Sequence, residues 1–171
     1  GVTGPIAGQN IGQGEGIRLD FIEDLTGTPT PGDYNDPGED NHDFDQHYLT
    51  NGAFVRFGDG TSTLTETSFK AFTVTETVDD NGDDNVADPL YTSQSLVSIV
   101  KVVITYDGDI VEFNFNAGDP DHSETLAVSD RDYTVTFVQQ SGEWYAEVQG
   151  VHDEEVQVTI FADEQYHALE L

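Results

Sequence analysis

Two stretches of the chain concentrate carboxylate and amide side chains as metal ions require. Residues 78–89 read VDDNGDDNVADP, with five carboxylates and no basic residue, and residues 26–47 read TGTPTPGDYNDPGEDNHDFDQH. Calcium takes about six to eight oxygen ligands, and segments rich in Asp, Asn and Gly can supply several of them. A loop this acidic repels itself without counterions. We therefore predict two calcium-binding loops, the first acidic loop (26–47) and the second acidic loop (78–89).

The second acidic loop begins like an EF-hand but does not complete one. Asp79, Asn81 and Asp83 have the spacing of the first three EF-hand ligands. Asp84 then stands where that motif requires Gly, and Leu90 stands where it requires a bidentate Glu. We therefore predict a calcium loop of another kind. Its candidate ligands are Asp79, Asn81, Asp83, Asp84, Asn85 and Asp88.

The first acidic loop offers oxygen donors for about two ions if it folds back on itself. These donors are Asp33, Asn35, Asp36, Glu39, Asp40, Asp43 and Asp45. Smaller candidate groups are Asp119 and Asp121 with Glu124, and Asp130 with Asp132. For Asp107-Gly108-Asp109 we favour a plain hairpin turn, because such turns select Asp and Gly in any case.

The residue pattern gives less support to other chemistry. His42 and His47 stand among acids and could form a zinc site, but their spacing matches no zinc motif, and exposed loop histidines are the favoured interpretation. Glu143 and Glu147 could act together in glycoside hydrolysis, yet a chain with 34 acids always offers some such pair. Nucleophile-elbow, zinc-protease, P-loop and dinucleotide motifs are absent. We predict that the protein is not an enzyme.

Composition limits the partners of the chain. The net charge is −29, with only five Lys and Arg among 171 residues. Such a surface repels phosphate backbones and anionic headgroups, so we expect neither nucleic acid nor membrane insertion. The same repulsion favours a monomer and opposes the compact state, which bound cations or adaptation to high salt would offset. No Cys is present, so calcium would have to serve where small secreted domains often use disulfides.

The elements that must position these loops are β-strands. In IVEFNFN, Val111, Phe113 and Phe115 alternate with polar residues, which is typical of a half-buried strand. Hairpins are predicted through Asp107-Gly108, Ser141-Gly142 and Asn51-Gly52. A short helix is possible over residues 89–97. We predict one domain over residues 1–171, an antiparallel β-sandwich of about eight to nine strands with long calcium-binding loops, with a closed barrel as the lesser alternative.

Three stretches resemble a known family in their order along the chain. They are IGQGEGIRLDFIEDLTG, FDQHYLTNGAFVRF and SFKAFTVTETV, in which a Gly-rich lead enters G-I-R-L-D-F, followed by the first acidic loop and a hydrophobic-Asn-Gly-hydrophobic segment. This order resembles modules of the giant calcium-dependent RTX adhesins of Gram-negative bacteria. The resemblance covers the first half of the chain well and the second half mainly through its strand pattern. The glycine-containing RTX repeats themselves are absent.

The resemblance implies a module cut from a larger secreted or cell-surface bacterial protein, with several Ca²⁺ ions that rigidify a β-sandwich. Its length and acidic loops favour a ligand-binding module over a plain extender, and among these a peptide-binding domain acting in adhesion or biofilm formation. A calcium ion with an incomplete protein shell would capture a peptide terminus, a protein or a glycan on another cell's surface. The aromatic contacts nearby would be Tyr34, Tyr48 or Tyr91. A structural spacer that contacts neighbouring modules of the same chain remains the main alternative.

Overall fold

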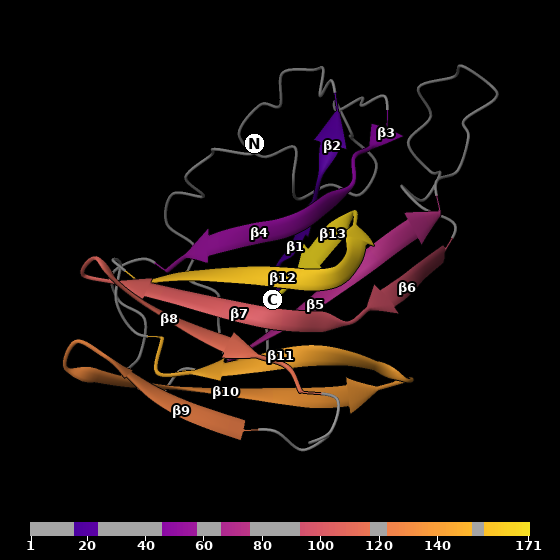
Figure 1. Ribbon diagram of the computed structural model, residues 1–171. Helices are drawn as coiled ribbons and strands as arrows, with labels where there is room; N and C mark the ends of the chain where they lie inside the picture. The colour runs from indigo at the N-terminus through magenta and orange to yellow at the C-terminus, as the bar shows by residue number, and fades with distance from the viewer. Residues whose placement is uncertain (1–15, 24–45, 58–65, 76–92, 117–122, 152–155) are drawn as a thin grey trace, which may run out of the picture.

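The computed structural model shows an all-β protein (Figure 1). The residues that it describes are 16–23, 46–57, 66–75, 93–116, 123–151 and 156–171. These ranges hold thirteen strands and no helix, hence no helix that is long and apolar enough to cross a bilayer. The predicted antiparallel β-sandwich is confirmed, because the strands form two packed sheets.

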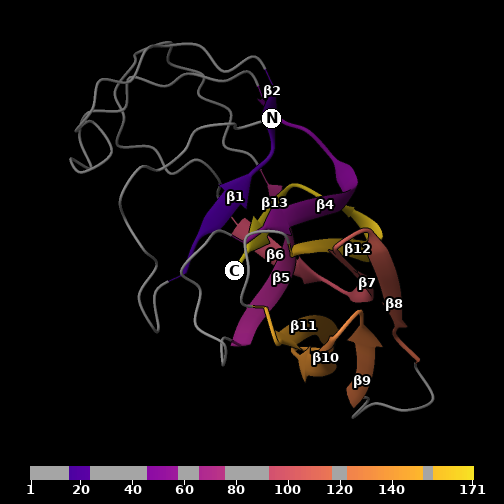
Figure 2. The ribbon, with the colours of Figure 1, turned by 90° about the vertical axis from the view of Figure 1, so that its left-hand side faces the viewer.

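The larger sheet has seven strands. Its order is β1 (Arg18–Asp20), β13 (Ala168–Glu170), β5 (Glu66–Thr75), β11 (Glu143–Gln149), β10 (Arg131–Gln140) and β9 (Ser123–Val128), with β6 (Ser93–Val97) also pairing with β5. The smaller sheet has the order β4 (Thr50–Arg56), β12 (Gln157–Tyr166), β7 (Ile99–Tyr106) and β8 (Asp109–Asn114). A separate ribbon pairs β2 (Ile22–Glu23) with β3 (Gln46–His47). Figure 2 shows the two sheets in a second view.

The core lies between the two sheets and follows the alternation seen in the sequence. Val102, Ile104, Val158 and Ile160 of the smaller sheet are fully buried. Phe69, Val135, Phe137 and Val148 are among the side chains of the larger sheet that meet them. Fully burying such a side chain contributes roughly 1.5–3 kcal/mol relative to leaving it exposed. This apolar layer holds the two sheets together and fixes the ends of the strands.

Two of the predicted hairpins are confirmed. β7 and β8 pair through Asp107 and Gly108, whose φ angles are 49° and 82°. β10 and β11 pair through Ser141 and Gly142, whose φ angles are 57° and 97°. Positive φ at both central residues is the signature of the type I′ turn, whose twist matches that of antiparallel strands. The Asp-Gly and Ser-Gly pairs therefore act as turns, as their sequences predicted.

The hairpin predicted through Asn51-Gly52 is wrong. β4 runs through both residues without a break, and Gly52 pairs with Phe161 of β12. A Cβ at Gly52 would lie 2.9 Å from Cε1 of Phe161, closer than side chains normally approach. Gly52 therefore gives the Phe161 ring room on an adjacent strand instead of supplying a turn. A local Asn-Gly signal is the same in both situations, so the sequence did not distinguish them.

The helix considered for residues 89–97 is wrong where it can be checked. Ser93–Val97 forms strand β6, in register with β5 from Ala71↔Val97 to Thr75↔Ser93, while residues 89–92 lie outside the described ranges. Hydrogen bonds to β5 stabilise this short segment as a strand, whereas a helix of the same length would be only marginally stable. Its side chains become gradually more buried from Ser93 to Val97, as the strand approaches the core.

The chain passes from one sheet to the other at two points, and at each point one strand ends and another begins. This helps to explain why more strands form than the sequence predicted. The stretch LVSIVKVVITY, expected to be one strand, is divided at Ser98 into β6 of the larger sheet and β7 of the smaller. The hydroxyl of Ser98 accepts the N–H of Trp144 at 3.1 Å and donates to Glu143. The second passage is at His167, between β12 and β13. Such corners join the two layers of a sandwich.

Candidate functional site

The predicted site residues lie almost entirely outside the described ranges. This applies to every predicted metal ligand of both acidic loops, to Asp119 and Asp121, and to Tyr34 and Tyr91. The calcium sites and these two aromatic contacts therefore stay predictions. The described residues do show where each acidic loop joins the sandwich, and these junctions can be compared in space.

Tyr48 is the predicted ligand contact that the structure describes. It is half-buried, its ring centroid lies 5.8 Å from that of Phe21, and its backbone N–H donates to the carbonyl of Phe21 at 2.9 Å. Phe21 in turn packs edge-on against Tyr166 at 5.9 Å. Tyr48 thus anchors the chain that follows β3, and its predicted role in ligand contact stays a prediction.

Each acidic loop is closed at its base by an antiparallel pair. The chain leaves the sandwich after Glu23 and returns at Gln46, and these two residues are partners in the β2–β3 ribbon. It leaves again after Thr75 and returns at Ser93, which are partners in the β5–β6 pair. Residues 24–45 and 76–92, which include most of the first and all of the second acidic loop, therefore each begin and end at one place.

The two bases meet at His167. Nδ1 of His167 accepts the backbone N–H of Val74, next to the base of the second acidic loop, at 2.9 Å. On its other side the His167 ring meets the ring of His47, at the base of the first acidic loop, at 6.0 Å between centroids. The carbonyl of His167 also accepts the N–H of Phe21 at 2.9 Å. The roots of both acidic loops are thus fixed to the same corner of the sandwich.

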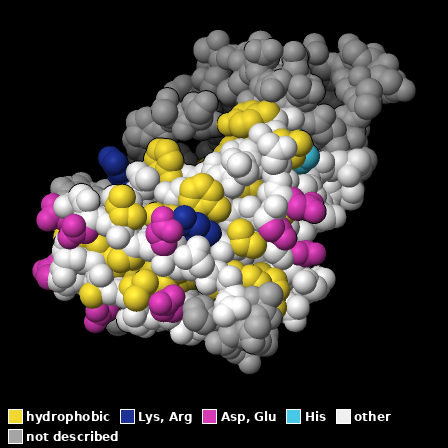
Figure 3. Space-filling view, viewed as in Figure 1, with side chains coloured by type: hydrophobic (Ala, Val, Ile, Leu, Met, Phe, Trp, Pro, Cys, Tyr) yellow, Lys and Arg dark blue, Asp and Glu magenta, His cyan; other side chains and the backbone are white. Residues whose placement is uncertain are grey.

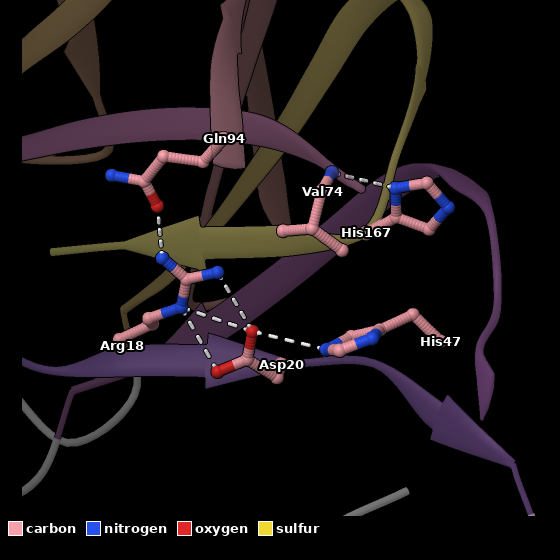
Figure 4. A network of polar contacts seen from close by, with 6 residues as sticks. All are labelled: Arg18, Asp20, His47, Val74, Gln94 and His167. Carbon is pink, nitrogen blue, oxygen red and sulfur yellow. Dashed lines mark hydrogen bonds and ion pairs between the residues drawn. The ribbon is translucent and has the colours of Figure 1, made fainter. Parts of the chain in front are cut away.

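A polar network extends this corner (Figure 4). Nε of Arg18 donates to both carboxylate oxygens of Asp20, at 2.9 and 3.0 Å, and Nη1 donates to Gln94 of β6. Oδ1 of Asp20 also lies 3.4 Å from Nε2 of His47. Arg18 therefore links β1 to β6, while Asp20 links β1 to β3. Because Nδ1 of His167 accepts a hydrogen bond, the proton of its neutral ring is on Nε2.

The structure corrects the interpretation of His47. The sequence favoured an exposed loop histidine, but His47 lies in β3 with 5% of its surface exposed. Pairing of β3 with β2 turns its ring towards Asp20 and His167. His42, its proposed partner in a zinc site, lies outside the described residues. The burial depends on strand pairing between residues far apart in the chain. The acidic residues next to His47 in the sequence gave no indication of this pairing.

Charge is distributed very unevenly along the chain. Residues 24–45 contain seven acids and residues 76–92 contain six, and neither segment contains Lys or Arg. The five basic residues lie one each on five strands, and Figure 3 shows Lys and Arg as isolated spots among acidic and hydrophobic side chains. Four have partners within the fold: Arg18 with Asp20, Lys101 with Glu112, Lys70 with Tyr145, and Arg131 with Tyr106. The acids of the two loops thus have no basic residue within their own segments to offset them.

The minor acidic candidates in the described ranges form ordinary turn contacts. Asp107 lies in the β7–β8 turn, and the carboxylate of Asp109 accepts the hydroxyl of Ser129 at 2.7 Å. Asp130 lies 4.0 Å from Nε of Arg131 in the β9–β10 turn. In the described part of the chain, no group of three or more His, Asp and Glu side chains is arranged to hold a metal ion. The hairpin turn predicted at Asp107-Gly108 is present.

We expect His167→Ala to destabilise the protein and His167→Asn to restore much of the loss. Alanine leaves the N–H of Val74 without its acceptor, which costs about 1–3 kcal/mol, whereas the amide oxygen of Asn can occupy the place of Nδ1. For a domain of this size the melting temperature should fall by about 2–12 °C in the Ala variant. Hydrogen exchange of the Val74 amide should accelerate in parallel. Equal loss in both variants would show that ring packing, and not this hydrogen bond, holds the corner.

Comparison of the chain with protein-family models, with curated proteins and with solved structures finds no match.

Proposed function

We propose that this protein is a calcium-dependent ligand-binding module of a secreted or cell-surface bacterial adhesin of the RTX type. The observation that carries the proposal is the convergence of the two acidic loop roots on the His167 corner. The two segments that begin and end at this corner contain thirteen acids and no Lys or Arg. Carboxylates at this density along the chain repel one another unless cations offset their charge.

The chemistry of the donors favours calcium. Both loops offer carboxylate and amide oxygens together with glycines and prolines that produce turns, and they contain no Cys. Hard oxygen donors suit Ca²⁺ and Mg²⁺, and the larger, more flexible coordination shell of Ca²⁺ suits irregular loops better. Residues Asp33–Asp45 and Asp79–Asp88 would hold the ions, which would supply positive charge and rigidity.

Ligand capture would use an ion whose protein shell is incomplete. An acidic protein repels an anionic group such as a peptide carboxylate, but an exposed Ca²⁺ inverts the local field. Because both loop roots share one corner, ions of both loops would serve a single binding end of the module. The partner would be a peptide, a protein terminus or a glycan on another cell, bound without turnover.

The rival function is a rigid spacer whose ions are fully coordinated by protein. Its support is the firm anchoring of both loop bases, which stiffness alone would also require. The two functions differ in what a single carboxylate contributes. In a spacer each ligand affects stability, whereas in a binding module one ligand of an open ion affects capture more than stability.

We expect Asp83→Ala or Asp36→Ala to abolish ligand binding while the melting temperature in calcium falls by less than about 4 °C. Binding would be measured on peptide and glycan arrays in millimolar calcium, with Asp130→Ala as the matched control. Asp130 has a side chain that is 88% exposed, far along the chain from both loops, and its removal should change neither property. Loss of stability in step with binding, across all loop variants, would instead favour the spacer.

A further inference from the structure

β6 borders a cleft in the larger sheet. The cleft has a volume of about 370 Å³ and is lined by Phe72 of β5, by Gln94, Ser95 and Leu96 of β6, and by Gln140, Ser141 and Glu143 of the β10–β11 hairpin. This volume is within the usual range of ligand pockets. In Figure 1, β6 lies on the right, above the tip of that hairpin.

The cleft exists because β6 and β11 pair with successive parts of the same edge of β5. β11 pairs with β5 from Glu66 to Phe69, and β6 pairs with it from Ala71 to Thr75. The two strands are joined where Ser98 bonds to Glu143 and Trp144, and they separate towards Gln94 and Ser141. Phe72 and Leu96, which are cross-strand partners on one face, form the apolar part of the lining.

Among the described strands, β6 pairs with β5 alone. Alternate residues of a strand direct their N–H and C=O groups to each side, so β6 directs one set towards the cleft. Native proteins protect such edges with charges, prolines or bulges. The sequence of β6, SQSLV, has no charge and no Pro, although β1, β4, β8 and β9, at the ends of the two sheets, each carry at least one charged residue. β6 is thus the edge best suited to accept another strand.

Arg18 orients the side chain at the rim of this cleft. It donates to the amide oxygen of Gln94, which directs the amide nitrogen of Gln94 away from Arg18 (Figure 4). That nitrogen can donate to a carbonyl group lying beside β6. Ser95 and Leu96 lie next along the strand, with exposure falling from Ser95 to Leu96. Along β6 the cleft therefore offers the oriented side-chain amide of Gln94, the backbone groups of the strand edge and the apolar side chain of Leu96.

We propose that this cleft binds an extended segment of another polypeptide, which adds as a strand to the edge of β6 that no described strand occupies and places an apolar side chain on Phe72 and Leu96. Main-chain hydrogen bonds supply affinity in such strand addition, and the pocket selects the side chain. The charge of −29 selects a neutral or basic segment and disfavours a second copy of this chain. The cleft is lined by residues of the strands and of one hairpin, none of which belongs to an acidic loop, and the proposed binding does not depend on an open calcium ion.

The test is selection from a phage-displayed library of random heptapeptides on the intact chain in calcium. The enriched peptides are expected to combine β-branched or aliphatic residues with Lys or Arg, and to lack Asp and Glu. Gln140→Trp, which fills the cleft from an exposed rim position, should weaken their binding at least tenfold. Gln139→Trp is the matched control, because Gln139 is also exposed on the same strand but does not line the cleft.

Two further measurements examine the strand addition itself. N-methylation of alternate residues of an enriched peptide should abolish binding in one register and spare it in the other, because only one edge of the peptide pairs with β6. Ser95→Lys, which adds a positive charge to the edge and repels a basic peptide, should weaken binding even if Gln140→Trp is poorly folded. The proposal is overturned if no peptide is enriched, if both Trp variants bind equally, if N-methylation has no effect, or if the chain forms a dimer that Gln140→Trp dissociates.

Discussion

Removal of calcium is expected to lower the melting temperature of this protein by about 10–20 °C. Each ion that binds only the folded state, at about a hundredfold its dissociation constant, contributes about 2.7 kcal/mol. Two ions at the His167 corner would contribute about 5 kcal/mol together. A domain of this size loses about 2–4 °C per kcal/mol. The measurement is thermal unfolding in millimolar calcium and in excess EDTA, at equal ionic strength.

The size of this effect follows from the geometry of the loop roots. Neither 24–45 nor 76–92 contains Lys or Arg, and the ends of both segments are fixed by strand pairs and by His167. Fixing the ends of two such acidic segments in the folded state would bring their charges together, so their repulsion would oppose folding until a cation binds. Calcium should consequently stabilise the protein far more than the same ionic strength of sodium chloride.

Magnesium and salt are the controls for this prediction. Magnesium should restore less than half of the loss, because it prefers a small octahedral shell and retains its water. If the transition is unchanged in EDTA, or if sodium chloride alone restores it, the acids are an adaptation to salt. The calcium-dependent function proposed above would then be wrong, whereas strand addition at β6 would not be affected.

Gly150→Ala is expected to destabilise the framework strongly, with a loss of at least about 3 kcal/mol. Gly150 has a φ of +93°, and a Cβ there would lie 2.6 Å from the carbonyl oxygen of Asp132 and 3.4 Å from the buried ring of Tyr133. Neither the backbone nor that ring can move without disturbing β10. The melting temperature should fall by about 6–12 °C.

Gly142→Ala is the matched control for Gly150→Ala. Gly142 has nearly the same φ, +97°, but a Cβ there would meet no atom within 4 Å. Its substitution costs only the conformational preference, about 1 kcal/mol. Urea denaturation of both variants separates the two contributions. Equal losses would show that the close approach of Gly150 to β10 is not a constraint on the sandwich.

The two proposed binding sites lie at different positions on the module. The acidic loops arise at the His167 corner, and the β6 cleft begins where the chain returns from the second loop at Ser93. Gln94 contacts both regions, because Arg18 joins it to Asp20 and so to His47. A variant such as Gln140→Trp changes the cleft without touching this network. The two binding activities can therefore be measured separately in the same protein.

The sequence alone determined the fold class and the confirmed turns of this protein. Alternation in IVEFNFN and similar stretches reports burial directly, because successive side chains of a strand point to opposite faces. Asp107-Gly108 and Ser141-Gly142 predicted their hairpins because positive φ is a local requirement. The acidic composition of residues 26–47 and 78–89 is also the basis for predicting bound calcium, which stays a prediction.

Only the tertiary structure decided which distant residues meet. Asn51-Gly52 does not turn because Phe161, more than one hundred residues away, packs against Gly52. Ser98 divides an expected strand, and His167 precedes a strand that was not expected, because each carries the chain from one sheet to the other. His47 is buried, and both acidic loops share one corner, because β2, β3, β5 and β13 come together there. These outcomes depend on pairings between remote segments, and such pairings leave no periodic signal in the local sequence.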